Sequence, residues 1–476
     1  MELASILAAM LATALLADRA VRPRARGRGR SAAGTAMLAL MTMALFGGFL
    51  ALSGHVIAAA LFASLLVAAL ALVSNAKNAV LGEPLLFSDL ALLGAVFRHP
   101  QFYVSALHRW QILLLGGGAV LLVALLAAAF VPAAAPHVIG GAVAAAALAA
   151  LWLLQHLAPI AVVPDTHANV GRHGLLPTLL LHGLEWRRAT DPPPCTAPPV
   201  ETDISLIVIV QCESFADPVE LYGDAALALP GLARARAGAS RWGKLLVSGF
   251  GAYTMRTEYG VLFGRSEAEL GFRRFDPFLT AIGEASHALP ARLGPKRWRR
   301  LFVHPHDMRF YGRDRIMPAA GFDELIGEAG FPPPGAGEGR YVSDAAITDR
   351  IIALAGAART PMLIHAVTIE NHGPWPPGPA SDAQQQGAWL PLVRRSDAML
   401  TALADALQGL GRPALLVFYG DHRPSIPGVS MPGGERHTPY VILRFHADAG
   451  SGRSDGGPQD LTPAELHHAI LAELAR

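Results

Sequence analysis

Four side chains after residue 200 stand where they could bind a metal or attack an ester. Glu213 follows one apolar run, and Asp421 and His422 follow another that ends at Tyr419. Thr254 comes after a glycine-containing turn and before a segment that favours a helix. A hydroxyl on a strand-to-helix turn is held by stiff elements yet stays accessible, which suits a nucleophile.

The four groups together offer three oxygen ligands and one nitrogen ligand, a set that suits a divalent Mn, Mg or Zn ion. A metal on the Thr254 oxygen would lower the pKa of that hydroxyl and hold it for attack. His372, which follows a further apolar run, could hydrogen-bond a phosphate oxygen or protonate a leaving group. Singly, each of these residues is more often a helix cap or a loop hydrogen-bonder, so the prediction depends on their combination.

The elements that must position these groups are predicted to be alternating strands and helices. Continuous apolar runs predict strands over Ile204–Val210, Leu245–Val247, Leu301–His304, Met362–Val367, Ala414–Tyr419 and Tyr440–Phe445. Helices are predicted over Asp344–Ala355, Leu390–Leu410 and Pro463–Ala475, the last with a capping box that begins at Thr462. This alternation predicts an α/β domain with a mostly parallel sheet covered by helices, and such sheets carry their sites beyond the carboxyl ends of the strands.

The N-terminal third is rich in Ala, Leu, Val and Gly, and it predicts an α-helical membrane domain. Its five apolar stretches approach the length of about 20 residues that a span needs, and they are Leu3–Leu16, Ala36–Leu52, Ile57–Val73, Ile112–Phe130 and Val138–Leu154. We therefore expect transmembrane helices in 1–160, a juxtamembrane helix and proline-rich linker in 161–200, and a catalytic domain in 201–476. The net charge of +2 favours no nucleic-acid partner.

The sidedness of the membrane domain is left open by the sequence. Six arginines lie between Arg19 and Arg30, and the positive-inside rule places that segment in the cytoplasm. If all four later stretches span, the C-terminal domain then also lies in the cytoplasm. The piece Asn75–Tyr103 could be re-entrant or interfacial, which would change the count of spans.

Six short motifs after residue 200 resemble those of a known family and stand in the same order. The motifs are Gln211–Phe215, Thr254–Glu258, Phe310–Asp314, Glu370–Trp375, Tyr419–His422 and Thr438–Tyr440. They are similar to the motifs of the lipoteichoic acid synthase and phosphoglycerol transferase group, in the sulfatase-like branch of the alkaline phosphatase superfamily. The resemblance covers roughly residues 200–446 and the layout of several preceding helices.

The resemblance implies a specific site, with Thr254 as the nucleophile and a metal held by Glu213, Thr254, Asp421 and His422. It implies that Arg313 and His372 contact the phosphate or glycerol of the substrate, and we add Arg256 as a further substrate contact. Mn²⁺ or Mg²⁺ is expected and Zn²⁺ is possible. The resemblance also implies a multi-pass protein of the inner (cytoplasmic) membrane with a periplasmic or extracellular catalytic domain, which we adopt over the argument from the arginines.

The expected reaction is transfer of a phosphoglycerol group from phosphatidylglycerol to a glycan or polyol phosphate acceptor, with a phosphorylated threonine intermediate. A phosphoethanolamine transferase, a phosphodiesterase and a catalytically inactive membrane sensor or scaffold are the alternatives. Sulfate-ester hydrolysis is disfavoured because neither Cys195 nor Cys212 begins the Cys/Ser-x-Pro-x-Arg pattern of sulfatases. Two cysteines also cannot form the several disulfides usual in the phosphoethanolamine transferases that modify lipid A.

Overall fold

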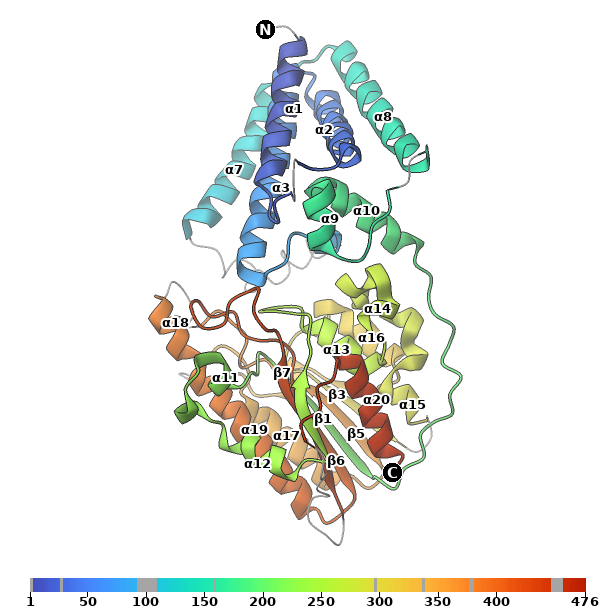
Figure 1. The fold of residues 1–476 in the computed structure, drawn as a ribbon, viewed down its shortest axis with the longest axis vertical. Helices are drawn as coiled ribbons and strands as arrows, with labels where there is room; N and C mark the ends of the chain where they lie inside the picture. Colours follow the sequence, from blue (N-terminus) through green and yellow to red (C-terminus); the bar gives the residue numbers. More distant parts are fainter. Residues whose placement is uncertain are drawn as a thin grey trace. The chain divides into compact units, whose positions relative to one another are not determined.

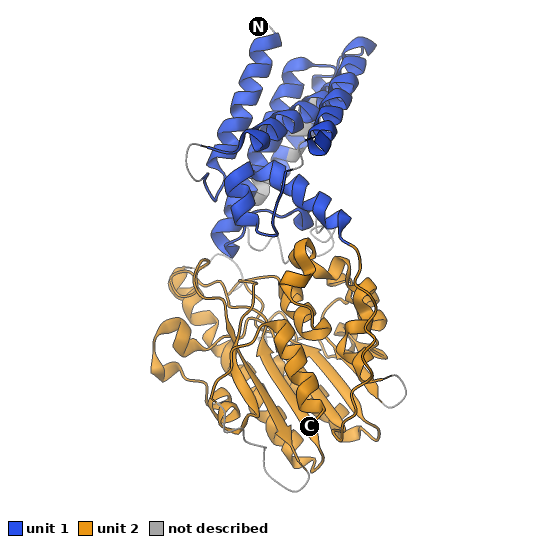
Figure 2. Ribbon diagram, turned by 45° about the vertical axis from the view of Figure 1, so that its right-hand side comes forward, with its two compact units in different colours: residues 1–189 blue, residues 190–476 orange. Residues whose placement is uncertain are grey.

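The structure is a computed structural model. It describes residues 3–25, 29–91, 109–157, 160–294, 298–335, 339–375, 381–446 and 457–476. The chain forms two compact units, Met1–Ala189 and Thr190–Arg476, which are coloured separately in Figure 2.

The first unit is helical throughout its described residues. Its helices are α1 (Leu3–Ala20), α2 (Ala32–Ser53), α3 (Val56–Leu81), α4 (Phe87–Ala91), α7 (Arg109–Ala128), α8 (Ala134–Leu157), α9 (Thr166–His173) and α10 (Leu175–Arg188), as Figure 1 shows. Four of them, α1, α2, α3 and α8, are long and apolar enough to cross a membrane. Helix α7 covers most of the remaining predicted stretch. The chain is therefore anchored to a membrane by its N-terminal helices.

Local signals set the ends of these helices. Gly54 adopts a left-handed φ of 68° and ends α2, and His55 caps the first turn of α3 through its side chain. Helix α3 then runs to Leu81, beyond the predicted end at Val73. The first residues of the piece Asn75–Tyr103 therefore continue α3, residues 92–103 lie outside the described part of the chain, and a re-entrant or interfacial position of the rest stays a prediction.

The arginine-rich segment lies at the same end of the first unit as α9 and α10. The backbone N–H of Ser31 donates to the carbonyl of Arg172 at 2.7 Å, and Arg30 Nη1 donates to the carbonyl of Val170 at 2.7 Å. At the opposite end, Val131 N–H donates to Ser53 O at 2.8 Å. The segment that bears the arginines is thus fixed to the helices from which the chain continues into the second unit.

The second unit is built on one mixed sheet of seven strands. These are β1 (Leu206–Cys212), β2 (Arg241–Leu245), β3 (Arg299–Val303), β4 (Glu324–Ile326), β5 (Met362–Val367), β6 (Ala414–Gly420) and β7 (Thr438–Phe445). Their order is β2-β7-β6-β1-β5-β3-β4. The five strands from β6 to β4 pair in parallel, and only β7 runs antiparallel to its neighbours. The predicted α/β fold with a mostly parallel sheet is confirmed.

Helices cover both faces of the sheet. The longer helices of this unit are α12 (Pro230–Gly238), α13 (Thr254–Phe263), α17 (Asp344–Ala357), α19 (Leu390–Gly409) and α20 (Pro463–Leu474), and the shorter ones are α11 (Pro218–Tyr222), α14 (Glu267–Leu270), α15 (Leu289–Arg292), α16 (Arg313–Ala319) and α18 (Asp382–Ala388). Helices α12, α17 and α19 pack on one face, and α13 and α20 lie over the other (Figures 1 and 2). Helix α20 begins with the predicted capping box at Thr462.

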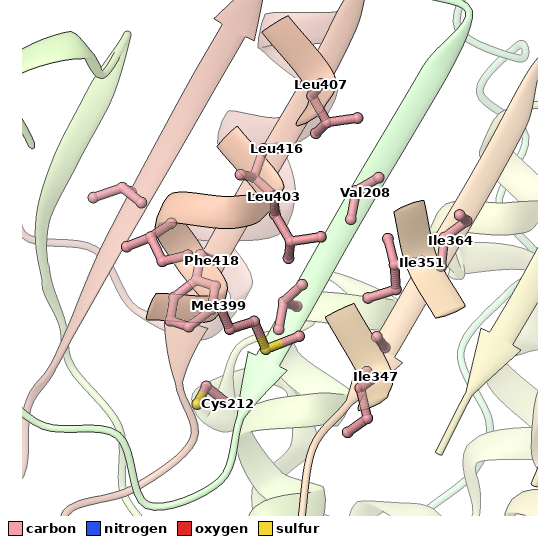
Figure 3. Close-up of a cluster of buried hydrophobic side chains, with 14 of the residues drawn as sticks. Val208, Cys212, Ile347, Ile351, Ile364, Met399, Leu403, Leu407, Leu416 and Phe418 are labelled. Atoms are coloured by element: carbon pink, nitrogen blue, oxygen red, sulfur yellow. The ribbon is translucent and has the colours of Figure 1, made fainter. Parts of the chain in front are cut away.

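The main hydrophobic core fills the layer between the sheet and helices α17 and α19. Figure 3 shows this layer, with Val208, Ile364, Leu416 and Phe418 on the strands and Ile347, Ile351, Met399, Leu403 and Leu407 on the helices. Burial of each such side chain contributes about 1.5–3 kcal/mol. The core therefore fixes the strands rigidly and, with them, the loops at their carboxyl ends.

Candidate metal centre

Glu213 and Asp421 meet because the two strands that precede them are neighbours in register. Cys212 of β1 pairs with Gly420 of β6, so the next residue on each strand leaves the same edge of the sheet at the same point. The ligand atoms of Glu213, Asp421 and His422 lie within 4.8 Å of one another, and all three residues are buried. Three of the four predicted metal ligands are thus brought together.

Gly420 is needed for this close approach. A methyl group in place of its hydrogen would lie 2.0 Å from the carbonyl oxygen of Phe215 and 3.0 Å from Cβ of Thr438. The first distance is far below any tolerated contact with backbone. Only glycine lets the chain that follows Glu213 pass directly against the end of β6.

The charges in the cluster call for a cation. Burial and the neighbouring carboxylate of Asp421 raise the pKa of Glu213 well above its ordinary value. Oδ2 of Asp421 is buried and has no hydrogen-bond partner among the described residues. His422 Nδ1 lies 3.2 Å from the carbonyl of Arg423, so Nδ1–H donates there and the lone pair of Nε2 is left for a ligand. A divalent cation would satisfy all three groups.

Ser214 ties the two carboxylates together. Its N–H donates to Asp421 Oδ1 at 2.8 Å, its Oγ donates to Glu213 Oε1 at 2.9 Å, and its carbonyl accepts from Trp389 Nε1 at 3.2 Å. These bonds require a left-handed φ of 49° at a residue other than glycine. Thr257 adds a bond from its Oγ1 to the carbonyl of Asp421, at 2.7 Å. Such outer bonds orient metal ligands.

Thr254 is the first residue of α13, and its helix is held against the cluster. Gly251 N–H, in the preceding turn, donates to the carbonyl of Arg423 at 2.9 Å, one residue beyond His422. Thr257 lies three residues after Thr254 and therefore on the same helix face, the face that contacts Asp421. The positive end of the helix dipole favours a developing alkoxide or a phosphate at Thr254. Its role as ligand and nucleophile remains a prediction.

The guanidinium of Arg313 makes its main interaction in a buried ion pair with Glu258. Its Nη2 donates to Glu258 Oε2 at 2.6 Å and its Nε to Oε1 at 3.1 Å, and both side chains are almost completely buried. Nη1 lies 3.4 Å from Nε2 of His304. Glu258, which the sequence indicated only as a residue that starts a helix, lies in the second turn of α13 and anchors the guanidinium. A substrate contact of Arg313 remains a prediction.

His372 is neutral in this structure. Burial lowers the pKa of His372 to about 4. Its Nδ1 lies 2.8 Å from the carbonyl of Gly373, so the ring donates there and Nε2 is the basic nitrogen. The ring also packs edge-on against Tyr341, at 5.8 Å between ring centroids. In this tautomer Nε2 is suited to accept a proton, and it can protonate a leaving group only after it has gained one.

Arg256 braces the turn before Thr254. Its guanidinium carbon lies 3.8 Å from the ring centroid of Tyr253, and its Nε donates to the carbonyl of Phe275 at 3.2 Å. Tyr253 has a left-handed φ of 73°, the second such corner of the site that is not a glycine. The stacked arginine stabilises that corner, and the predicted substrate contact of Arg256 is not tested by these bonds.

A comparison with protein families decides the affiliation of this unit. Residues 205–469 match the family model described as Sulfatase. The chain belongs to the sulfatase family. It therefore lies in the sulfatase-like branch of the alkaline phosphatase superfamily, as the motifs predicted, and it is an enzyme of a class that uses divalent metals.

Several known proteins are similar to this sulfatase-family chain. The capsular polysaccharide biosynthesis protein RkpI of Rhizobium meliloti is 29% identical over 462 residues, 90% of this chain and 85% of the relative. The phosphoglycerol transferase GacH of Streptococcus pyogenes is 17% identical, with a TM-score of 0.46 over 58% of this chain and 76% of GacH. The periplasmic domain of EcEptC from Escherichia coli, in a complex with Zn, is 13% identical, with a TM-score of 0.42 over 59% and 86%.

Three residues of the sulfatase-family site had roles that were not found from the sequence. The roles of Ser214 and Glu258 depend on contacts that join distant segments. The third residue, Asp344, is linked through Ser396 to Asn371, the residue before His372: Ser396 Oγ donates to Asp344 Oδ2, and Asn371 Nδ2 donates to Ser396 at 2.8 Å. Burial and Glu370 raise the pKa of Asp344 to about 7. Ser214, Glu258 and Asn371 each lie inside one of the six motifs, and this was the signal in the sequence that could have pointed to them.

Proposed function

We propose that the protein transfers the phosphoglycerol headgroup of phosphatidylglycerol to a glycan or polyol phosphate acceptor through a phosphorylated Thr254. The main support is the buried Glu213–Asp421–His422 cluster beside the N-terminus of α13. A threonine at that position, in place of the cysteine or serine that sulfatases oxidise, favours phosphate over sulfate esters. The name of the relative RkpI, which refers to a capsular polysaccharide, supports a glycan acceptor.

The residues divide the reaction into two displacements. A divalent ion, Mn²⁺ or Mg²⁺ ahead of Zn²⁺, would be held by Glu213, Asp421, His422 and Thr254, and it would acidify the Thr254 hydroxyl and offset charge on the phosphate. Thr254 Oγ loses its proton and forms a bond to phosphorus while the bond to the diacylglycerol oxygen breaks, and that oxygen takes up one proton, so the proton count is unchanged. An acceptor hydroxyl then attacks the same phosphorus and gives its proton to His372 Nε2, the bond between phosphorus and Thr254 Oγ breaks, and Thr254 Oγ takes a proton back to restore both residues.

The direct experiment uses full-length protein and phosphatidylglycerol labelled in its acyl chains. Thr254→Ala should lower the release of labelled diacylglycerol by at least about 10³-fold, because the nucleophile is lost. The matched control is Thr401→Ala, since Thr401 Oγ1 only bonds back to Asp397 O within α19. Chelation of divalent metal should abolish release in the wild type, and Mn²⁺ should restore it.

Other outcomes would reject specific parts of the proposal. Undiminished release by Thr254→Ala removes that residue as nucleophile. Faster turnover of phosphatidylethanolamine favours a phosphoethanolamine transferase, and free glycerol phosphate as the sole product favours a phosphodiesterase. A wild-type protein that binds metal and turns over no lipid favours a sensor or scaffold.

We further propose that the catalytic unit faces the periplasm or the outside of the cell. The support is the resemblance of the six motifs to the phosphoglycerol transferase group, which implies an extracytoplasmic catalytic domain. The segment around Arg30 bonds to α9, so the proposal goes against the positive-inside rule, which would place that segment in the cytoplasm. The test introduces cysteine at Ala25 or Ala226 in a Cys195→Ser background and applies an impermeant thiol reagent to intact cells. Labelling of both positions agrees with the proposal, and labelling of neither places the catalytic unit in the cytoplasm.

A further inference from the structure

A second polar site lies in the first unit, outside the metal centre. A cavity of about 210 Å³ opens where α1 ends and α2 begins. Its polar lining includes Arg19, Thr35 and His173, and its apolar lining includes Leu15 and Leu38. The apolar residues lie on α1 and α2, helices apolar enough to span a membrane, and the polar residues lie at the helix ends. The cavity therefore has one wall suited to lipid and one suited to a headgroup.

The charged pair at the base of the cavity compensates itself. Arg30 Nε donates to Asp18 Oδ2 at 3.0 Å, and its two Nη groups donate to four backbone carbonyl oxygens. Asp18 Oδ1 accepts from the N–H of Leu175 at 2.9 Å. All five N–H groups of Arg30 are thus used within the protein. The excess charge in the lining is that of Arg19, which is exposed and has no ion-pair partner among the described residues.

His173 supplies a hydrogen-bond donor that the described residues do not use. Ser31 Oγ accepts from the N–H of Gly34 at 3.0 Å and lies 2.8 Å from His173 Nδ1. The hydroxyl proton of Ser31 then has Nδ1 as its acceptor, which places the proton of the neutral ring on Nε2. His173 is 3% exposed, and its Nε2 has no hydrogen-bond partner among the described residues. A buried N–H of this kind needs an acceptor oxygen.

The N-terminus of α2 adds to the positive electrostatic potential in the cavity. Ser31 is the N-cap of this 22-residue helix, and Gly34 and Thr35 of its first turn line the cavity. The N–H groups of Gly34 and Thr35 are already bonded to Ser31, so the contribution of this terminus is the positive end of the helix dipole, which attracts anions. We propose that this cavity binds the phosphate group of a membrane phospholipid, with Arg19, Thr35 and His173 around the phosphate and Leu15 and Leu38 against the apolar part of the lipid.

The test measures lipid retained by full-length protein. Detergent-solubilised protein is titrated with short-chain phosphatidylglycerol, phosphatidylcholine and inorganic phosphate, and bound ligand is counted by native mass spectrometry. Arg19→Gln and His173→Phe should each weaken binding of both phospholipids by about tenfold. The matched control is Arg22→Gln, because Arg22 is an exposed arginine of the same segment that does not line the cavity. Thr254→Ala should bind as the wild type does, which separates this site from the catalytic proposal.

Three results would overturn the assignment. Equal losses in Arg19→Gln and Arg22→Gln would show general attraction to a basic surface. Unchanged binding in both cavity variants would remove the site. Inorganic phosphate that binds as tightly as the phospholipids would identify free phosphate, not lipid, as the ligand. Since Arg19 is exposed, Arg19→Gln keeps the test valid even where His173→Phe does not fold.

Discussion

The Asp18–Arg30 pair of the first unit and the Glu213–Asp421–His422 cluster of the second are both buried groups of ionisable side chains. In the first, the chain itself supplies a partner for every charge: Arg30 neutralises Asp18, and backbone groups take up the remaining bonds. In the second, two carboxylates share one histidine, His422, whose Nε2 lies 3.5 Å from Asp421 Oδ2, and Oδ2 of Asp421 has no hydrogen-bond partner among the described residues.

The two groups differ in the source of the positive charge that balances the carboxylates. We call the Asp18–Arg30 pair closed because the chain supplies that charge, and the Glu213–Asp421–His422 cluster open because an external cation must supply it. A closed pair fixes two segments of one chain to each other, as Arg30 fixes the end of α1 to α9. An open cluster is unstable alone, because burial disfavours the charged form of each carboxylate. The rigid sheet holds the carboxylates close together, and an external cation is needed to offset their repulsion. Three predictions test this contrast, and each concerns the full-length protein in detergent.

The largest effect is expected when the closed pair is broken. Arg30→Met leaves the carboxylate of Asp18 buried without a cation, which should lower the free energy of unfolding of the first unit by about 3–5 kcal/mol. Thermal unfolding followed by tryptophan fluorescence measures this loss. Arg22→Met, an exposed change in the same segment, should have little effect. The double variant Asp18→Asn with Arg30→Met should regain part of the loss, and a double variant no more stable than Arg30→Met would contradict the charge argument.

Removal of a charge from the open cluster should raise the stability of the metal-free protein, whereas removal of a charge from the closed pair lowers stability. The pKa of Glu213 is raised in the folded protein, so metal-free protein loses stability as pH rises from the ordinary glutamate range through that raised pKa. Glu213→Gln does not ionise, and without metal it should be more stable than the wild type at pH 8, with the difference shrinking towards pH 4. Mn²⁺ at 100 times its Kd should stabilise the wild type by about 2.7 kcal/mol and the variant much less.

A metal-free Glu213→Gln that is less stable than the wild type at pH 8 would show that the cluster is closed by the chain after all. Calorimetry of the wild type and the variant at two pH values, each with chelator and with Mn²⁺, gives all four comparisons.

The smallest effect is expected from the bonds that orient the open cluster. Ser214→Gly keeps the left-handed backbone and its N–H bond to Asp421 but removes the Oγ bond to Glu213, and Mn²⁺ affinity should fall by about tenfold. Ser214→Ala removes the same bond but keeps the Cβ at φ 49° that glycine lacks, so it should bind metal as weakly as Ser214→Gly and unfold at a lower temperature than Ser214→Gly. Isothermal titration measures the affinity. Equal affinity in the wild type and Ser214→Gly would leave Ser214 with a structural role only.

The central strands could be predicted because they are buried on both faces. Met362–Val367 was predicted with its observed bounds, and Ala414–Tyr419 within one residue. The edge strands were not: β2 spans Arg241–Leu245 and was placed two residues too late at its end, and Glu324–Ile326 was missed. An edge strand has one solvated side, so its apolar run is short or broken.

The functional sites could be predicted from the sequence only where their residues follow a local pattern or a general rule of the fold. Contacts between side chains far apart in the sequence could not be predicted. The adjacency of Glu213 and Asp421 followed from the rule on parallel strand ends, whereas the pairing of Arg313 with Glu258, 55 positions apart, follows no local pattern. From the sequence, Arg30 was grouped with five other arginines as one positively charged segment. In the structure its side chain is buried and its charge is neutralised by Asp18. A sequence shows how many charges a segment carries but not which of them face water.

Gly420 has no functional group, yet its lack of a side chain decides whether the two carboxylates can converge. In a random-mutagenesis screen for lost activity, this position should therefore score with Glu213 and Asp421, and in a natural population it should tolerate no variant. An interpreter who equates mutational intolerance with chemistry would assign it a catalytic role. Gly420 contributes only by having no side chain. This lets the backbone after Glu213 approach the end of β6 closely enough for Glu213 and Asp421 to reach one metal ion.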